Sequence, residues 1–226
     1  MAESSTQPEN YFFKTLYESV LLNEKSKLIW FGLDYSIVKI CCNQNNPFDK
    51  YPFKKEYFNG WNDYILTERR FFEPNSTTGI SNITLKIMTP NLTFIKQRNE
   101  SINFEKVFTD SAQIRIIPLD SLRNLIRSYQ IDNIPGLGAV IMITDIRKPS
   151  EGLNIDETVT GYFIIFDIHS KSVIICERFT ENANGIGMHW HWTKPIKSFF
   201  DNINYEPNKQ TWKEIYYDNV LKFLKK

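Results

Sequence analysis

The stretch GYFIIFDIHSKSVIICERF, residues 161–179, decides the fold class of this chain. Two runs of apolar, β-branched and aromatic residues flank a short Ser-Lys turn, which is the pattern of a β-hairpin. Both runs are apolar at nearly every position, so both faces of the hairpin must be covered. The stretch therefore predicts two antiparallel strands, over 159–169 and 172–180, buried inside a layered domain.

A third strand is predicted before this hairpin. The run AVIMITDI, residues 139–146, has the same two-sided apolar character and predicts a strand over 138–147 of the same sheet. After the hairpin, Thr193 is placed to cap a helix that reaches about Asn202, and Thr211 is placed to open another. The C-terminal half therefore predicts the order β-β-β-α-α.

The N-terminal half predicts one strand and two helices. The run LIWFGLDYSIVKI, residues 28–40, places its apolar residues on one face of a strand. One helix near 7–22 opens with a capping box, and a second over 54–72 has apolar residues at helical spacing. Residues 73–113 are polar and rich in asparagine, which fits a surface insertion or irregular edge strands. A further helix begins near Asp120.

These elements predict an α/β (α+β) fold in which one sheet is layered with helices. Because a hairpin and a central strand have helices before and after them, we expect a mixed or mainly antiparallel sheet. No repeat, heptad run or linker divides the 226 residues. We therefore predict a single domain over 1–226, with a poorly defined irregular segment at about 73–113.

The charge balance limits the partners. Lys plus Arg is 27 and Asp plus Glu is 26, which gives a formal charge of +1. A surface that follows nucleic-acid phosphates needs a basic excess, so we expect no nucleic-acid partner. No apolar run approaches the ~18 residues of a membrane span, and the N-terminus lacks the features of a signal peptide. We expect a soluble cytoplasmic protein, although a chain whose signal had been removed would look the same.

The cysteines give no sign of a metal or redox motif. Cys41 and Cys42 are adjacent and lack the spacing of a zinc knuckle or a C-x-x-C pair, and Cys176 makes the count odd. We expect three reduced thiols.

The stretch GIGMHWHWTKP, residues 185–195, raises the question of a metal site. On an extended backbone, residues two apart point to the same side, so His189 and His191 would share a face while Trp190 and Trp192 point away. A zinc ion needs three or four ligands, and the spacing supplies no third. The histidine pair is a metal site only in our alternative interpretation.

The glycine pairs are not cofactor motifs. Gly136-x-Gly138 precedes a strand, whereas a dinucleotide fingerprint follows one, and Gly185-x-Gly187 lacks the third glycine. Both pairs are interpreted as turns. We expect no cofactor.

Three residues are candidates for binding. Asp34 is a carboxylate in an otherwise apolar strand, which is costly unless it is paired or exposed. It marks a functional pocket at the end of the strand, or else it faces solvent or accepts a backbone hydrogen bond. Trp190 and Trp192 suit stacking on a sugar, a base or a partner protein if they are exposed, and packing at a junction if they are not.

Two patches of the chain resemble a group of uncharacterised bacterial proteins. GLDYS, residues 32–36, is similar to a G-[ILV]-D-[FY]-S signature, and the hairpin followed by Gly185-x-Gly187 and Trp192 is similar to a C-terminal pattern of the group. The group has no assigned activity, so the resemblance implies no reaction. Its members have arginine, asparagine and tyrosine between the second glycine and the tryptophan. The resemblance therefore implies that His189 and His191 are not a family metal site.

The sequence favours a non-catalytic binding domain, because it contains no complete catalytic constellation and has aromatic residues beyond the needs of a core. A small ligand, another protein and a second copy in a homodimer all remain open as the partner. The alternative is a metal-dependent hydrolase, in which His189, His191 and a carboxylate hold an ion that lowers the pKa of a bound water.

Overall fold

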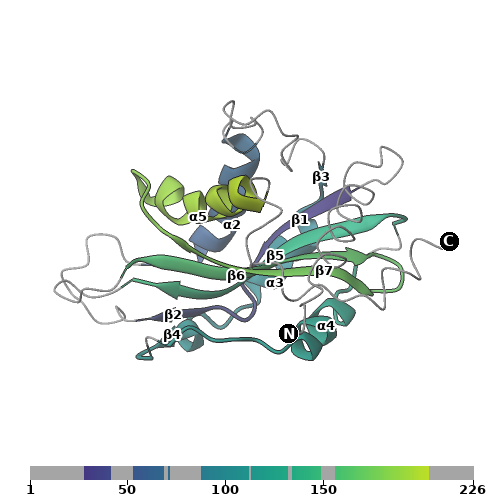
Figure 1. Cartoon of the computed structure of the whole chain (residues 1–226), viewed down its shortest axis with the longest axis horizontal. Coiled ribbons are helices and arrows are strands. Elements are labelled where there is room, and N and C mark those ends of the chain that lie inside the picture. Colours follow the sequence, from purple (N-terminus) through teal and green to yellow (C-terminus); the bar gives the residue numbers. More distant parts are fainter. Residues whose placement is uncertain are drawn as a thin grey trace, which may run out of the picture.

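The structure is a computed structural model that describes residues 28–41, 53–68, 71, 88–111, 113–131, 134–148 and 156–203. In these ranges seven strands form one sheet with helices on both faces, an α/β arrangement (Figure 1). The helices predicted near 7–22 and from Thr211 lie outside the described residues.

The described elements are, in chain order, β1 (Leu28–Asp34), β2 (Lys39–Cys41), α2 (Glu56–Thr67), β3 (Met88–Pro90), α3 (Thr93–Glu100), the 3-10 helix η3 (Phe104–Val107), β4 (Phe108–Thr109), α4 (Leu119–Arg127), β5 (Leu137–Arg147), β6 (Thr158–Asp167), β7 (Val173–Asn182) and α5 (Met188–Ile203).

β5 is the central strand of the sheet. β1 pairs in parallel with the first half of β5 and β2 with its second half, so residues 28–41 follow β5 as one strand interrupted by a turn at 35–38. β3 pairs in parallel with β1, and β4 with β2, on the outer edge. On the other side of β5, the strands β6 and β7 follow in antiparallel order.

The prediction of a mainly antiparallel sheet is wrong. Within the described residues, four of the six strand pairings are parallel. The apolar hairpin dominated the sequence pattern, whereas β2, β3 and β4 are two or three residues long and too short to show a period. Parallel pairing also requires long crossover connections, and the segments with α2, α3 and α4 provide them between β1 and β5.

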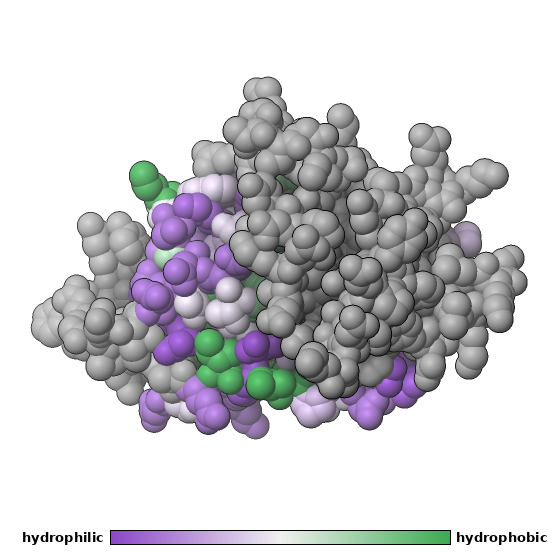
Figure 2. Space-filling view, viewed as in Figure 1, coloured by the Kyte–Doolittle hydropathy of each residue, from purple (hydrophilic) through white to green (hydrophobic). Residues whose placement is uncertain are grey.

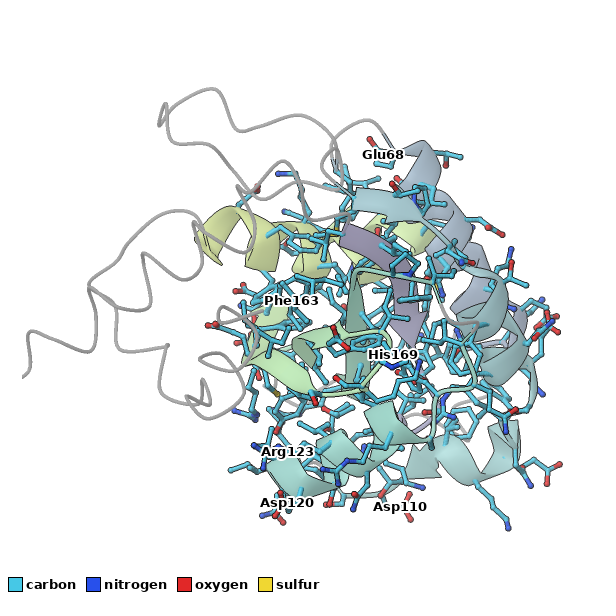
Figure 3. All side chains as sticks on the ribbon, turned by 90° about the vertical axis from the view of Figure 1, so that its right-hand side faces the viewer. Glu68, Asp110, Asp120, Arg123, Phe163 and His169 are labelled. Atoms are coloured by element: carbon cyan, nitrogen blue, oxygen red, sulfur yellow. The ribbon has the colours of Figure 1, made fainter. Side chains whose placement is uncertain are left out.

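Helices cover the sheet from both sides. α2 and α5 pack on one face, where Phe163 of β6 lies 5.8 and 5.7 Å from the rings of Phe199 and Phe200 (Figure 3). α3 and α4 pack on the other face, where Leu122 and Ile126 join a second core. Burial of each such side chain contributes roughly 1.5–3 kcal/mol. No helix within the described ranges is both long and apolar enough to span a bilayer.

The prediction of an extended segment before a helix at Thr193 is also wrong. α5 begins at Met188, so the two histidines and Trp190 lie in its first turns and Pro195 lies inside it. The Thr193 hydroxyl caps no free amide; its Oγ1 donates to the carbonyl of His189 at 2.8 Å. A threonine followed by a proline suits a helix start, but the same threonine can also satisfy a carbonyl one turn back.

The described part of the predicted irregular segment is ordered into short elements. Residues 88–111 contain α3, η3 and the two short edge strands β3 and β4. The run LTFI, residues 92–95, is strand-like in composition, yet most of it forms the first turn of α3.

The cysteines differ from the prediction of three reduced thiols. Cys41 is disulfide-bonded. Cys176 is a buried thiol on β7, as predicted. Cys42 lies outside the described residues.

Candidate functional site

Asp34 ends β1 as a carboxylate with no exposed surface. It accepts three hydrogen bonds: from the amide of Ser36 at 2.8 Å, from Nε of Arg98 at 3.0 Å and from the hydroxyl of Tyr129 at 2.6 Å. A buried carboxylate is costly unless such donors replace its water. The Asp34 side chain is therefore paired on all sides rather than open to a substrate.

Arg98 and Tyr129 also contact each other. The Arg98 guanidinium lies 5.2 Å from the centre of the Tyr129 ring, a cation–π geometry. Burial raises the pKa of the Tyr129 hydroxyl well above its ordinary value, and the charge of Asp34 and its hydrogen bond raise it further. Tyr129 therefore stays protonated and remains a donor to Asp34.

Two buried asparagines hold the backbone beside Asp34. The side-chain amide of Asn62, from α2, accepts from the amide of Leu33 at 2.6 Å and donates to its carbonyl at 3.0 Å. Asn99, from α3, donates to the same carbonyl at 2.9 Å and accepts from the amide of Tyr35 at 2.9 Å. These side chains take the place of a neighbouring strand in the gap between β3 and β4. Without them the buried backbone groups would cost about 1–3 kcal/mol each.

Gly32 makes this arrangement sterically feasible. Its φ is +105°, a conformation that L side chains rarely adopt, and a Cβ there would overlap the Asn62 side chain and lie 2.8 Å from Leu92 Cδ2. The glycine of the GLDYS stretch is thus required by the close approach of α2.

The turn at 35–38 connects Asp34 to a second ion pair. Nε of Arg115 lies 2.9 Å from Oδ1 of Asp145 on β5, and its Nη2 donates to the carbonyl of Ile37 at 2.8 Å and to that of Thr144. By accepting the Ser36 amide, Asp34 fixes the turn that presents the Ile37 carbonyl. Asp34 and Arg115 therefore bond to the same turn, at the Ser36 amide and the Ile37 carbonyl.

Beside this ion pair, one face of the sheet changes from apolar to polar. The second core includes Met142 of β5, Tyr162 of β6 and Cys176 of β7. Further along the same face of these three strands, the side chains carry charged groups and hydroxyls. The strand register places these on one face, which we call the polar face: Asp145, Arg147, Thr158, Thr160, Arg178 and Thr180. The opposite face at the same level carries Ile146 and Val159, which belong to the first core.

The polar face contains buried groups without partners. Within the described residues, eight buried side-chain polar atoms have no hydrogen-bond partner, and four of them lie on this face. They are Oδ2 of Asp145, Nε of Arg147, Oγ1 of Thr158 and Nε of Arg178. Such groups are rare in folded proteins, and each one is usually explained by strain, by a functional role or by a bound water or ion.

The two histidines of the opening turns of α5 do not converge. The His189 ring is stacked on Tyr64 at 5.4 Å, whereas Nε2 of His191 lies 2.7 Å from Glu157 and its Nδ1 lies 3.1 Å from the carbonyl of Gly185. Residues two apart on a helix point about 200° apart. In the described part of the chain, no group of three or more His, Cys, Asp or Glu side chains is placed to hold a metal ion.

The candidate tryptophans lie away from Asp34. Trp192 is buried on the α2 and α5 side of the sheet, 5.0 Å from the ring of Phe53. Trp190 is half-buried, with its ring 6.2 Å from that of Phe71. Asp34 faces the α3 and α4 side, through Arg98 and Tyr129. The three residues therefore do not form one site.

Exposed apolar residues are few among those described. Ile116 is 72% exposed and Ile186 is 95% exposed. Ile116 precedes α4 and Ile186 precedes α5, on opposite sides of the sheet. Among the coloured atoms of Figure 2, hydrophilic residues lie between the hydrophobic group at the upper left and those at the lower centre. The two isoleucines do not make a continuous docking surface.

No protein-family model matches the chain, and no curated protein matches it.

Of the residues in this site, sequence reasoning singled out Asp34 alone as a binding residue. The alternation of Thr158 and Thr160 in the hairpin, and of Asp145 and Arg147 in the preceding strand, is a signal for one polar sheet face. Asn62 carries no comparable signal, because its partner is the backbone of a strand 29 residues away.

Proposed function

We propose that the chain is a non-catalytic α/β domain that binds a small polar ligand on the polar face. The gathering of four buried, unpartnered polar atoms on three adjacent strands carries this proposal. Asp145 and Thr158 are 5% and 6% exposed, and an unsatisfied group at such depth costs about 1–3 kcal/mol. A ligand that supplies the missing hydrogen bonds would recover this free energy.

Within the described residues, the polar face reaches solvent on its β7 side. Thr180 on β7 is exposed, and it shares a 2.9 Å hydrogen bond with the buried Thr160. Arg147 and Arg178 are half-buried, and the Nε atom of each is buried. We propose that a ligand reaches the unpartnered groups from this side.

The geometry favours binding over catalysis. Asp34 already accepts three hydrogen bonds, which leaves it unsuited to the role of a general base. His189 and His191 contact different partners, so the metal-dependent hydrolase receives no support from their arrangement.

Thr158→Val tests the proposal, since valine keeps the shape of threonine and removes the unpartnered hydroxyl. We expect the variant without ligand to be equally stable or up to about 1 kcal/mol more stable in urea unfolding. We expect it to lose much of the rise in melting temperature that a ligand gives the wild-type chain. The ligands would come from a thermal-shift screen of polyols, amino acids, organic acids and sugar phosphates.

Thr93→Val is the control, because Thr93 is an exposed residue at the start of α3. It should leave every ligand-induced shift unchanged. The proposal fails if no compound at millimolar concentration raises the wild-type melting temperature, or if Thr158→Val leaves all the shifts intact.

A further inference from the structure

We infer that the ligand of the polar face is a small organic anion that carries a hydroxyl or amino group beside its acidic group. This inference rests on the proposed function and names the class of ligand. Its basis is the placement of two unpaired guanidinium groups around one threonine.

Arg147 and Arg178 are diagonal neighbours of Thr160. Thr160 lies opposite Asp145 on β5 and opposite Thr180 on β7, and each arginine is two residues from one of these positions on the same face. Diagonal neighbours in a sheet lie about 7–8 Å apart, within reach of long side chains. Both guanidinium groups can therefore contact one ligand placed over the Thr160–Thr180 hydroxyl pair.

The described part of the protein does not neutralise either arginine. Among the described residues, the side chains of Arg147 and Arg178 have no ion-pair partner and no hydrogen bond, and the Nε of each is buried. Among the described residues, three of the acidic groups nearby are engaged or face elsewhere. Asp145 is paired with Arg115, and Glu157 is paired with His191. Glu177 lies on the opposite face, opposite Phe163.

Among the described residues of the polar face, Arg147 and Arg178 outnumber Asp145, so the balance of charge is positive. A guanidinium offers paired N–H donors that match the geometry of a carboxylate or a phosphate. Burial of the Nε atoms strengthens this preference, because an anion replaces the water that these donors have lost.

Asp145 adds a second requirement. Its Oδ1 is occupied by Arg115, whereas Oδ2 is buried and has no partner. A free acceptor next to two cationic groups selects a ligand that has a donor close to its anionic group. The hydroxyl of Thr158, also without a partner, can serve the same part of the ligand.

Titration calorimetry on the full chain with four probes tests this inference. The probes are glycerol 3-phosphate, glycerate, glycerol and inorganic phosphate. We expect glycerol 3-phosphate or glycerate to bind and glycerol not to bind, and the stronger of the two anions identifies phosphate or carboxylate as the acidic group. We expect inorganic phosphate, which lacks the adjacent alcohol, to bind more weakly than glycerol 3-phosphate.

Variants then test the two arginines. Arg147→Gln and Arg178→Gln should each weaken binding of the anion by about tenfold or more, the usual effect of losing a charge-assisted hydrogen bond. Arg147→Lys should retain part of the affinity. Arg127→Gln is the control, because Arg127 is exposed on α4. Melting temperatures of all the variants would establish that they are folded.

The outcomes separate this inference from the proposed function. Binding of glycerol that equals binding of the anions, unchanged by either glutamine variant, would overturn the anionic class and leave a ligand site on the face. Equal affinity for inorganic phosphate and glycerol 3-phosphate would overturn the requirement for a donor. A chain that binds none of the probes but is stabilised by a neutral compound from the wider screen refutes this inference alone. A chain that binds nothing refutes both.

Discussion

Asp34 shows how much a single buried charge depends on its neighbours. We expect Asp34→Asn to lower the free energy of unfolding by about 3 kcal/mol, near the lower end for a broken buried ion pair. The variant keeps the shape of the side chain but leaves Arg98, which is 21% exposed, without its counter-ion. Urea unfolding followed by tryptophan fluorescence would measure the change.

Asp63→Asn provides the matched control. Asp63 of α2 and Lys96 of α3 form an ion pair at 2.9 Å, but their side chains are 57% and 33% exposed. Exposed pairs contribute about 0–1 kcal/mol, so this change should have little effect. Equal losses in the two variants would mean that burial does not govern the Asp34 interaction.

Glu177 is a second buried acidic residue whose environment leads to a testable prediction. Burial raises the pKa of its carboxyl to about 8, and the side chain has no hydrogen-bond partner among the described residues. The folded chain therefore holds a proton that the unfolded chain releases near its ordinary value. The contribution of this group to the free energy of unfolding is largest below that ordinary pKa. It is lost as the pH rises toward 8, by up to about 1.4 kcal/mol per pH unit.

Glu177→Gln should remove this dependence, because glutamine stays neutral at every pH. Unfolding free energies of both chains would be measured from pH 5 to 9. We expect the wild-type value minus that of the variant to fall as pH rises and to level off above about 8. A constant difference across this range would show that Glu177 ionises normally in the folded state.

At the scale of the elements, two glycines in different surroundings should respond in opposite ways to alanine. A Cβ at Gly60, within α2, would meet only Cε1 of His189 at 3.5 Å. Gly60→Ala should therefore raise the stability by about 0.5–1 kcal/mol, the usual gain in a helix interior. Thermal and urea unfolding would both detect it.

Gly138 on β5 is the contrasting case. A Cβ there would lie 2.5 Å from Cζ of Phe166 and 2.8 Å from Cε2 of Phe31, two buried rings stacked on each other. Gly138→Ala should cost about 1–3 kcal/mol, as overpacked cores do. If Gly138→Ala raised the stability, as Gly60→Ala should, the close approach of these two rings would not limit the space at position 138.

The elements also show what the sequence could predict. The apolar runs at 139–146 and 161–179 predicted β5, β6 and β7, because burial on both faces leaves a continuous pattern. From Thr193 and Pro195, the start of α5 was predicted too late in the chain. Both residues fit the first turn of a helix, but they also fit a helix interior, where the Thr193 hydroxyl donates to the carbonyl of His189.

The site was less predictable than the strands. Asp34 stood out because a carboxylate in an apolar strand needs a partner, but that partner, Arg98, is 64 residues away. Asn62 and Asn99 replace strand partners of Leu33 only once α2 and α3 are folded against β1. Such long-range pairings depend on topology, which local residue patterns do not encode.

At the scale of the whole molecule, the sheet has a well-paired centre and short pieces at one edge. β5 is paired along both sides, with β1 and β2 on one side and β6 on the other. β3 and β4, at the outer edge, are three and two residues long. Amides in a central strand with buried cover on both faces open only when the whole domain unfolds, whereas short edge pairings open locally.

Hydrogen exchange followed by mass spectrometry should therefore rank the strands. We expect peptides from β5 and β6 to exchange most slowly, with the opening free energy of global unfolding, and peptides from β3 and β4 at least about tenfold faster. Rates from the chain unfolded in urea would correct for intrinsic differences between peptides. Equal protection of β3 and β5 would mean that the asparagine bridges at Leu33 hold the outer edge as firmly as backbone pairing holds the centre. Asn99→Ala would then have to lower the protection of β3, because it removes the bond from α3 to the Leu33 carbonyl.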